Sequence, residues 1–306
     1  MEKRRFGKTD LQVSVLGFGG APIGFLHTEQ KEIERILHAL LDHGCNVIDT
    51  AAMYQGSEDA IGKALGNRRG ECVLISKCPN SLAEPWTAKA VRNSVDRSLQ
   101  RLQTDVIDVM LLHTCSEEIL KQGDVLDTLV KTREAGKVRF VGFSGDNQAA
   151  AHAVTIPDIA VIETSINICD QGNIDSVLPL AQKHDIGVIV KRPIANAAWK
   201  NPKDQPGFYA GYSRTYTERL QEMKVTPAQL GFSGAADTVW PEIALRFTLS
   251  QPGVHTAIIG TTNPDHVNAN LTSAAQGALD ARAIDKLREA FRQAEQQAGD
   301  KWLGLT

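Results

Sequence analysis

Short apolar runs alternate with amphipathic stretches along most of this chain. Eight of these runs are typical of buried parallel β-strands, because they are short, continuous and rich in Val, Ile and Leu. The run VIDVMLLH at 106–113 shows the pattern most plainly. The predicted strands cover 15–19, 46–50, 72–77, 106–113, 138–143, 159–164, 186–191 and 256–260.

Between these runs, apolar residues recur every three or four positions, as on one face of a helix. Thr28 and Asp124 are placed to cap two such helices, and two others would begin at Ser57 and Thr87. Gly136 is placed to end the helix that begins at Asp124. Further helices are predicted over 174–184 and 264–275, with a last one at about 281–297.

Eight strands, each followed by a helix or loop, predict an α/β fold: one (β/α)8 TIM barrel domain spanning 1–306. A doubly wound sheet is the alternative, but no Ser/Gly/Pro-rich linker divides the chain, and Gly17-Phe18-Gly19-Gly20 matches the GxGxxG fingerprint poorly. Two additions are expected besides the C-terminal helix. A β-hairpin at about 3–14 would plug the N-terminal mouth of the barrel, and a long loop at about 192–240 would follow the seventh strand.

The composition is that of an ordinary soluble protein, with 42% hydrophobic and 23% charged residues among 306. The net charge of −3 provides no basic face, which argues against a nucleic-acid partner. No apolar run approaches the roughly 18 residues of a membrane span, and the first residues lack the apolar stretch of a signal peptide. The five cysteines have no CxxC spacing, which favours reduced thiols in the cytoplasm over a disulfide framework or a metal site.

Polar residues stand where the predicted strands end, and barrel enzymes place their sites at the carboxyl ends of the strands. The second strand ends near Asp49, and Tyr54 is in the loop that follows. The third strand ends in Lys77 and the fourth in His113. A carboxylate, a phenol, an ammonium group and an imidazole are therefore expected to converge. Each alone is more typical of a cap, a loop or a surface position.

The contexts of these four residues are more specific than the residues themselves. Asn46-Val47-Ile48-Asp49-Thr50-Ala51, followed by Tyr54, Gly56-Ser57-Glu58 and Ile61-Gly62, resembles the signature of the aldo-keto reductase superfamily. Ser76-Lys77 and Leu111-Leu112-His113 are similar to the next two motifs of that family, in the same order. The resemblance runs from the hairpin to about residue 275. It is nearest to the bacterial, potassium-channel-β-like and aldose-dehydrogenase-like branches.

The resemblance implies reversible hydride transfer between a nicotinamide cofactor and a carbonyl group. Tyr54 would be the general acid in reduction, although a phenol has an ordinary pKa of about 10. The charge of Lys77 would lower that pKa, by up to about three units for a charge at ~4 Å. Asp49 would hold Lys77 in place, and His113 would orient the substrate oxygen.

The resemblance also implies a set of cofactor contacts, with departures from the family pattern. Ser144 is kept, but Glu163 stands where Gln is common. Lys191-Arg192-Pro193 replace the aromatic residue that stacks on the nicotinamide. Arg192 could stack there, or Lys191 and Arg192 could pair with Glu163 or with phosphate. The complete set of implied cofactor-binding residues is Gly20, Ala21, Asp49, Ser144, Glu163, Lys191, Arg192, Pro193, Gly260, Thr261, Thr262, His266 and Asn270.

The cofactor is expected to be NADP(H) or NAD(H). NADPH-preferring relatives usually carry Lys or Arg after the eighth strand to hold the 2′-phosphate, whereas this chain has Gly260, Thr261 and His266 there. That difference makes a strong NADP preference doubtful. The helix beginning at Pro264 remains suited to a phosphate group at its N-terminus.

The substrate is expected to be a small aldehyde or ketone in a pocket formed by Phe25, Met53, Trp86 and His113, with Leu26, Thr114 and the 192–240 loop. Two other functions stay open. One is an NAD-dependent aldose dehydrogenase working in the oxidative direction, which the Gly19-Gly20-Ala21-Pro22-Ile23-Gly24 stretch resembles. The other is a nucleotide-sensing regulatory subunit, although the four residues together favour an enzyme. The sequence does not indicate an oligomeric state.

Overall fold

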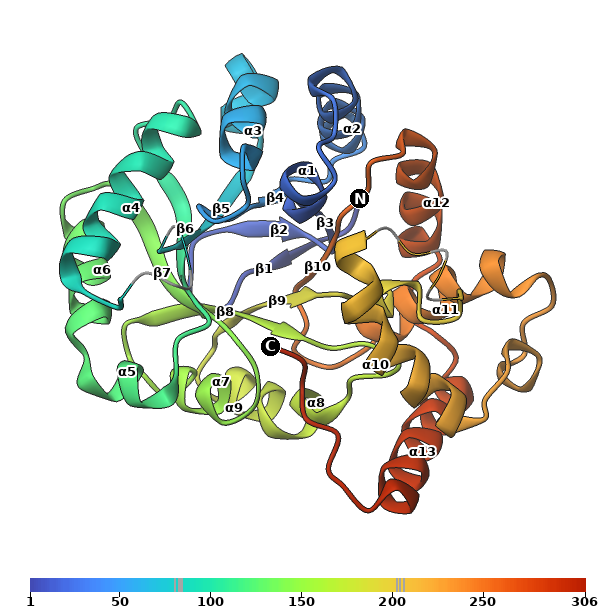
Figure 1. The fold of residues 1–306 in the computed structure, drawn as a ribbon. Helices are drawn as coiled ribbons and strands as arrows, with labels where there is room; N and C mark the ends of the chain where they lie inside the picture. The colour runs from blue at the N-terminus through green and yellow to red at the C-terminus, as the bar shows by residue number, and fades with distance from the viewer. Residues whose placement is uncertain (80, 82–84, 202, 204, 206) are drawn as a thin grey trace.

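The computed structural model describes residues 1–306 except 80, 82–84, 202, 204 and 206, and it leaves out the side chains of 207–210 and 212. Eight parallel strands close into a barrel, so the predicted (β/α)8 fold is confirmed (Figure 1). Each predicted strand is present. The barrel strands are β3 (Leu16–Gly19), β4 (Val47–Asp49), β5 (Val73–Cys78), β6 (Ile107–His113), β7 (Val138–Ser144), β8 (Ile159–Ser165), β9 (Gly187–Lys191) and β10 (Thr256–Ile259).

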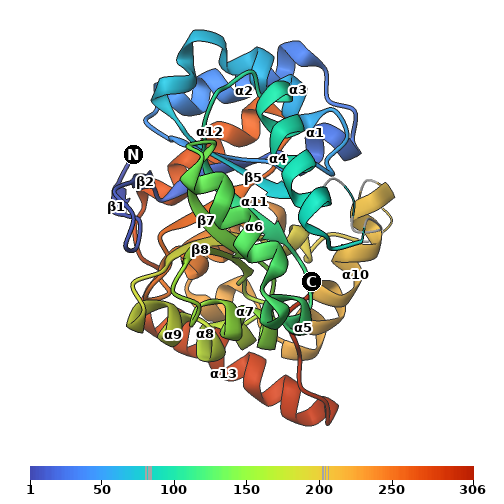
Figure 2. The ribbon, with the colours of Figure 1, turned by 90° about the vertical axis from the view of Figure 1, so that its left-hand side faces the viewer.

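The hairpin formed by β1 (Lys3–Arg5) and β2 (Gln12–Ser14) covers one end of the barrel. Phe6, Leu11 and Val13 are buried in one cluster with barrel residues such as Val109 and Leu111. Figure 2 shows the hairpin at the opposite end of the molecule from the C-terminus. The predicted plug therefore exists, and it leaves the other end of the barrel for the site.

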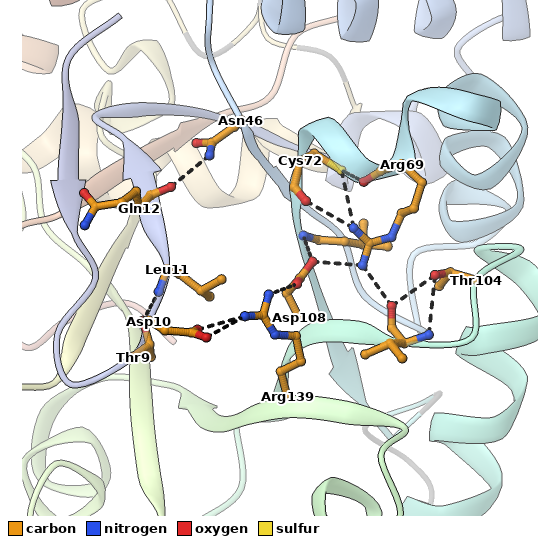
Figure 3. Close-up of polar contacts among 12 residues, drawn as sticks. Thr9, Asp10, Leu11, Gln12, Asn46, Arg69, Cys72, Thr104, Asp108 and Arg139 are labelled. Carbon is orange, nitrogen blue, oxygen red and sulfur yellow. Dashed lines mark hydrogen bonds and ion pairs between the residues drawn. The ribbon is translucent and has the colours of Figure 1, made fainter.

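A buried carboxylate connects the barrel to this hairpin (Figure 3). Asp108 on β6 accepts hydrogen bonds from Arg69 Nη2 and Arg139 Nη1, each at 2.8 Å, and from Leu74 N at 2.9 Å. Arg139 Nη2 also donates to Asp10 in the hairpin turn at 2.8 Å. Two guanidinium groups thus share one carboxylate at the plugged end of the barrel, where polar contacts contribute to stability rather than catalysis.

We expect Asp108→Asn to reduce the free energy of unfolding by about 2–3 kcal/mol, because it leaves two guanidinium groups without their buried counter-charge. Asp10→Asn is the matched control. The Asp10 side chain is 71% exposed, so its pair with Arg139 should contribute less than about 1 kcal/mol. Urea denaturation of both variants would check this. Equal costs for the two substitutions would contradict the role given to Asp108.

Helices surround the barrel and connect its strands (Figures 1 and 2). α4 begins where predicted, and Thr87 caps it, because its side chain accepts a hydrogen bond from Ala90 N at 3.2 Å. Gly136 follows α6 with a φ of +75°, which is the left-handed conformation expected after a helix. The helices before the long insertion are α1 (Ala21–Phe25), α2 (Gln30–Asp42), α3 (Ser57–Leu65), α4 (Ala88–Arg101), α5 (Glu117–Gln122), α6 (Asp124–Glu134), α7 (Asn147–Ala153), α8 (Gly172–Ser176) and α9 (Leu178–Lys183).

Three predicted helix boundaries were wrong. Thr28 is not the cap of α2, since its hydroxyl donates to Pro22 O and Glu29 takes the N-cap position. Asp124 is the first residue of α6, and Gly123 precedes it. The predicted helix over 174–184 is divided at Val177 into α8 and α9, because Pro179 near the start of α9 has no N–H for a continuing helix.

The stretch 192–240 is mostly helical rather than a loop. It contains the 3₁₀ turns η2 (Ala195–Ala197) and η4 (Pro227–Leu230), α10 (Gly207–Met223) and the beginning of α11 (Ala236–Leu249). α12 (Pro264–Ala275) follows β10, and α13 (Ala281–Ala298) is the predicted last helix. Tyr216, Ile243 and Leu287 are fully buried in one cluster, so α10, α11 and α13 form a second core beside the barrel.

All five cysteines are free and buried, which agrees with the prediction of reduced thiols that act as small apolar residues. In the described part of the chain, no helix is both long enough and apolar enough to cross a membrane.

Candidate active site

Polar side chains gather at the end of the barrel that the hairpin leaves open. Asp49 is the last residue of β4, and His113 is the last residue of β6. Lys77 stands one residue before the end of β5, between them. Along the sheet, His113 is in register with Ser144 and Ser144 with Glu163. Barrel closure therefore brings residues from five consecutive strands to one site.

Tyr54 lies in the loop between β4 and α3, which is held closely against α1. A Cβ on Gly24 would lie only 2.8 Å from Gln55 N and 2.9 Å from Tyr54 C, so this approach requires glycine. At the other end of the loop, the Ser57 hydroxyl donates to Gly20 O at 3.0 Å. These contacts hold the backbone that carries the phenol.

The Tyr54 ring lies among the other three candidate catalytic residues. Its centroid is 5.9 Å from that of His113 and 5.5 Å from that of Phe25, both in edge-to-face geometry. Lys77 Nζ lies 5.4 Å from the Tyr54 ring centroid. Asp49 contacts Lys77 directly, so the four residues implied by the resemblance form one constellation.

Asp49, Lys77 and Glu163 form a buried ion cluster of two carboxylates and one ammonium group. Lys77 Nζ donates to Asp49 Oδ1 at 2.6 Å, to Asp49 Oδ2 at 2.7 Å and to Thr50 O at 2.9 Å, which uses its three protons. Glu163 Oε2 is 3.2 Å from Nζ, within ion-pair distance, but it accepts no hydrogen bond from the described residues. Glu163 Oε1 accepts one from the Ser144 hydroxyl at 3.3 Å.

Burial and the neighbouring charges both shift the pKa values of the groups in this cluster. Burial alone would lower the pKa of Lys77, but the charges of Asp49 and Glu163 outweigh it and raise that pKa above its ordinary value. Burial and the charge of Glu163 raise the pKa of Asp49 well above its ordinary value, against the lowering by Lys77. Lys77 is thus firmly protonated, while Asp49 and Glu163 compete for one positive charge.

The pKa of Tyr54 differs from the sequence-based expectation. Lys77 acts in the expected direction and lowers it, but removal of the phenol from solvent raises it more, and Asp49 and Glu163 raise it further. The net pKa of Tyr54 is therefore above its ordinary value. The prediction counted one ammonium charge, and it did not include desolvation or the second carboxylate.

His113 is a neutral hydrogen-bonding group in this setting. Burial lowers the pKa of His113 well below its ordinary value, and the charges of Lys77 and Lys191 lower it further. Its Nδ1 is buried without a hydrogen-bond partner among the described residues. A neutral imidazole has one N–H, so His113 can donate a single hydrogen bond to an oxygen in the site.

A cavity of about 470 Å³ lies over these residues, and we call it the barrel-mouth cavity. Its volume is in the range of small-molecule sites. Most of the predicted site residues line it. These are Ala21, Phe25, Leu26, Asp49, Met53, Tyr54, His113, Thr114, Ser144, Glu163, Lys191, Arg192, Pro193, Gly260, Thr261, Thr262 and His266.

Four predicted site residues do not line the cavity. Lys77 is fully buried behind its wall, where it contacts Asp49 and Glu163. Trp86 is half-buried against the barrel core. Gly20 and Asn270 also lie outside the lining.

The lining includes Thr306, a position near the C-terminus that the sequence did not indicate. The preceding residues are held over the ends of the strands: Leu305 N donates to Asp170 at 3.1 Å, and Gly304 N donates to Asn147 at 2.8 Å. These contacts join residues more than 130 positions apart, so no local sequence pattern predicts them.

The cations at the end of β9, Lys191 and Arg192, have protein partners other than Glu163, the one considered from the sequence. Lys191 pairs with Asp146 at 3.1 Å. The Arg192 guanidinium donates to Leu305 O and, at 3.4 Å, to the Ser165 hydroxyl. Neither side chain pairs with Glu163; Lys77 is the ion-pair partner of that carboxylate.

The first turn of α12 and the loop before it contribute to the lining of the cavity. Asn263 caps this helix by accepting from Asp265 N at 2.9 Å. The Thr261 hydroxyl accepts from Asn263 N at 3.1 Å and lies 3.2 Å from His266 Nδ1. Thr261 and His266 both line the cavity, so small polar groups and a helix N-terminus face it there.

Comparisons with known proteins show the family to which the chain belongs. The model of the Aldo/keto reductase family matches residues 15–292. An uncharacterized oxidoreductase from Bacillus subtilis, YqkF, is 28% identical over 96% of this chain and 97% of its own. L-galactose dehydrogenase from Arabidopsis thaliana is 25% identical over 94% of this chain and 91% of its own.

Among solved structures, the holo form of aldo-keto reductase AKR11C1 from Bacillus halodurans superposes with a TM-score of 0.79 at 26% identity. The match covers 95% of this chain and 96% of that one. The family match extends past residue 275, where the resemblance was expected to end. The chain belongs to the aldo/keto reductase family of oxidoreductases.

Proposed function

We propose that the barrel-mouth cavity binds a nicotinamide dinucleotide and a small carbonyl compound, and that the protein transfers hydride reversibly between them. The constellation of Tyr54, Lys77, Asp49 and His113 beside one cavity carries this proposal. Family membership supports it, since the chain belongs to a family of oxidoreductases.

The residues around the cavity fit such a dinucleotide. Glu163 Oε2 and His113 Nδ1 are buried polar atoms without a hydrogen-bond partner among the described residues, at the end where the ring would lie. Thr261, Thr262 and His266 also line the cavity, beside the N-terminus of α12, which is suited to phosphate groups. Ser144 and Glu163 would hold the carboxamide of the ring. The bound ring would supply or take up the hydride.

The protein's own residues would then manage the proton on the substrate oxygen. Tyr54 keeps its proton because its pKa is raised, and that is the form needed to donate to a carbonyl oxygen during reduction. The neutral His113 would donate a second hydrogen bond to the same oxygen and orient it. As the proton leaves Tyr54, the charge of Lys77 would stabilise the phenolate, and Asp49 would hold Lys77 in place.

We expect the same cavity to bind NAD(H) at least as tightly as NADP(H). Lys191 and Arg192 line the cavity, but they contact Asp146 and Leu305 O. Residues 260–275, around the N-terminus of α12, contain neither Lys nor Arg. A 2′-phosphate would therefore gain little there beyond His266 and the helix terminus.

A second candidate is oxidation of a sugar by NAD⁺ with the same residues working in reverse. The similarity to L-galactose dehydrogenase over most of both chains favours it, together with the scarcity of basic residues near α12. In that direction Tyr54 would have to lose its own proton first and accept that of the substrate hydroxyl as a phenolate, a form that its raised pKa disfavours near neutral pH.

Fluorescence titration with NADH and NADPH, followed by turnover with a panel of carbonyl compounds and aldoses, tests this proposal. We expect saturable binding of NADH, with a Kd no weaker than that of NADPH, and turnover of at least one substrate. Binding without turnover of any substrate would favour the regulatory subunit instead. Absence of binding by either dinucleotide would refute the proposal.

A further inference from the structure

We propose that Glu163 makes the barrel-mouth cavity discriminate between the two redox states of the dinucleotide, by stabilising the oxidised, cationic ring. This inference rests on the proposed function, since it requires a nicotinamide ring in the cavity. It assigns to Glu163 a role in specificity that differs from simply holding the carboxamide.

The first argument is the charge balance of the buried ion cluster. Asp49, Lys77 and Glu163 are 1%, 0% and 2% exposed, so water screens their charges little. Lys77 directs its three protons to both oxygens of Asp49 and to Thr50 O. When both carboxylates are ionised, the cluster carries one negative charge in excess. Glu163 is the less compensated carboxylate, because Lys77 donates hydrogen bonds to Asp49 and only forms an ion pair with Glu163.

The second argument is the position of that excess charge. Glu163 lines the cavity, whereas Lys77 lies behind the cavity wall. Glu163 Oε2 is buried 3.2 Å from Lys77 Nζ and accepts no hydrogen bond from the described residues, so the negative charge of this carboxylate is only partly compensated. Glu163 and the Tyr54 ring both lie near one ammonium group, at 3.2 Å and 5.4 Å from Lys77 Nζ. A ring that reacts beside Tyr54 therefore also lies near Glu163.

The third argument is that the nearby cations do not neutralise Glu163 directly. Lys191 pairs with Asp146, and Arg192 is directed to Leu305 O and Ser165. Burial keeps His113 neutral. The positive charge of Arg192 would instead favour the reduced, neutral ring. The predicted effect is therefore the difference in binding between variants with and without the Glu163 carboxylate.

The two redox states differ by one charge on the ring and hardly at all in shape. A nearby carboxylate attracts the cationic ring and has no comparable effect on the neutral one. At an effective dielectric of about 20, the attraction between unit charges about 6–12 Å apart corresponds to roughly a ten- to hundredfold difference in affinity. Glutamine occupies nearly the same volume but carries no charge, so Glu163→Gln isolates this contribution.

The test is the ratio of the dissociation constants of NADH and NAD⁺, measured by calorimetric titration at fixed pH and ionic strength on the wild type and on variants. The pair NADPH and NADP⁺ is measured in the same way. In Glu163→Gln we expect the ratio of the NADH to the NAD⁺ dissociation constant to fall at least about tenfold, because NAD⁺ loses the attraction of the carboxylate. This readout is independent of turnover.

Two variants control for effects other than charge. Glu163→Asp keeps the carboxylate and should keep the ratio within about threefold, even where both affinities fall. Ser144→Ala removes the hydroxyl that donates to Glu163 without changing the charge, so it should weaken both redox forms together. Thermal melting verifies that each variant is folded. If Glu163→Gln is unstable, Glu163→Met, which also removes the charge, takes its place, and the same change of the ratio is expected.

The outcomes separate this inference from the proposed function. Binding of both redox forms with an unchanged ratio in Glu163→Gln would overturn the inference and leave the proposed function standing. A change of the ratio in Ser144→Ala as large as in Glu163→Gln would also overturn it, because charge would not be the cause. If the wild type binds no dinucleotide, the proposed function itself fails, and this inference fails with it.

Discussion

Replacing Tyr54 with phenylalanine is expected to lower carbonyl reduction by about 10²–10⁴-fold, the range that general acid catalysis contributes. The substitution keeps the ring, and with it the edge-to-face contacts to Phe25 and His113. Only the hydroxyl is lost. The Kd of the dinucleotide should therefore stay within a few-fold of the wild type, and steady-state kinetics together with fluorescence titration check the two halves of this result.

Tyr216→Phe is a matched control for that variant. Tyr216 is also buried, but its hydroxyl donates to Asp170 at 2.9 Å and it does not line the barrel-mouth cavity. Its loss should affect stability and leave turnover within a few-fold. Residual turnover in Tyr54→Phe similar to that of Tyr216→Phe would show that another group supplies the proton.

Replacing Lys77 with methionine is expected to destabilise the fold by about 3–5 kcal/mol and to abolish most turnover. The cost arises because two buried carboxylates, Asp49 and Glu163, lose the cation between them. Turnover falls because the phenolate of Tyr54 loses the one charge in the ion cluster that lowers its pKa. Urea denaturation and steady-state kinetics measure the two effects.

The stability of Lys77→Met should also depend on pH. Burial and Glu163 already raise the pKa of Asp49, and loss of Lys77 raises it further. A carboxyl whose pKa is higher in the folded than in the unfolded state binds a proton on folding, so it favours the fold at low pH and loses that effect as pH rises. The variant should therefore be less destabilised near pH 5 than near pH 8, relative to the wild type.

Lys191→Met provides the comparison. It also removes a lysine from a buried carboxylate, Asp146, but Asp146 keeps hydrogen bonds from Ser165 N at 2.6 Å and from Thr164 and Asn173 at 2.9 Å each. Its cost should be smaller than that of Lys77→Met. A larger cost, or a Lys77→Met variant as stable as the wild type at both pH values, would contradict the role given to the ion cluster.

The barrel could be predicted from the sequence because its strands are buried on both faces and therefore appear as continuous apolar runs. The helix α10 was missed inside the predicted loop. Its inward residues Tyr216, Leu220 and Met223 do have helical spacing, but the Pro and Gly residues before them favoured a loop. Local spacing also failed at Val177, where Pro179 divides one expected helix into two.

Much of the candidate site was also predictable, since residues at the carboxyl ends of parallel strands must meet. Asp49, Lys77 and His113 follow from that rule, whereas Tyr54 in its loop depended on the family resemblance. The balance of charges was not predictable. Lys77 contacts Glu163, Lys191 contacts Asp146, and Arg192 contacts Leu305, and each of these pairs is far apart in the sequence. The same is true of Thr306, which lines the cavity from the C-terminus.

The most direct test of the proposed chemistry is to follow the absorbance of NADH when the purified protein is mixed with a nitrobenzaldehyde. Hydride transfer at this site predicts a loss of dihydronicotinamide that is matched mole for mole by the alcohol and is nearly absent in Tyr54→Phe. Unchanged absorbance with every carbonyl compound and dinucleotide, from a folded protein that binds NADH, would contradict it.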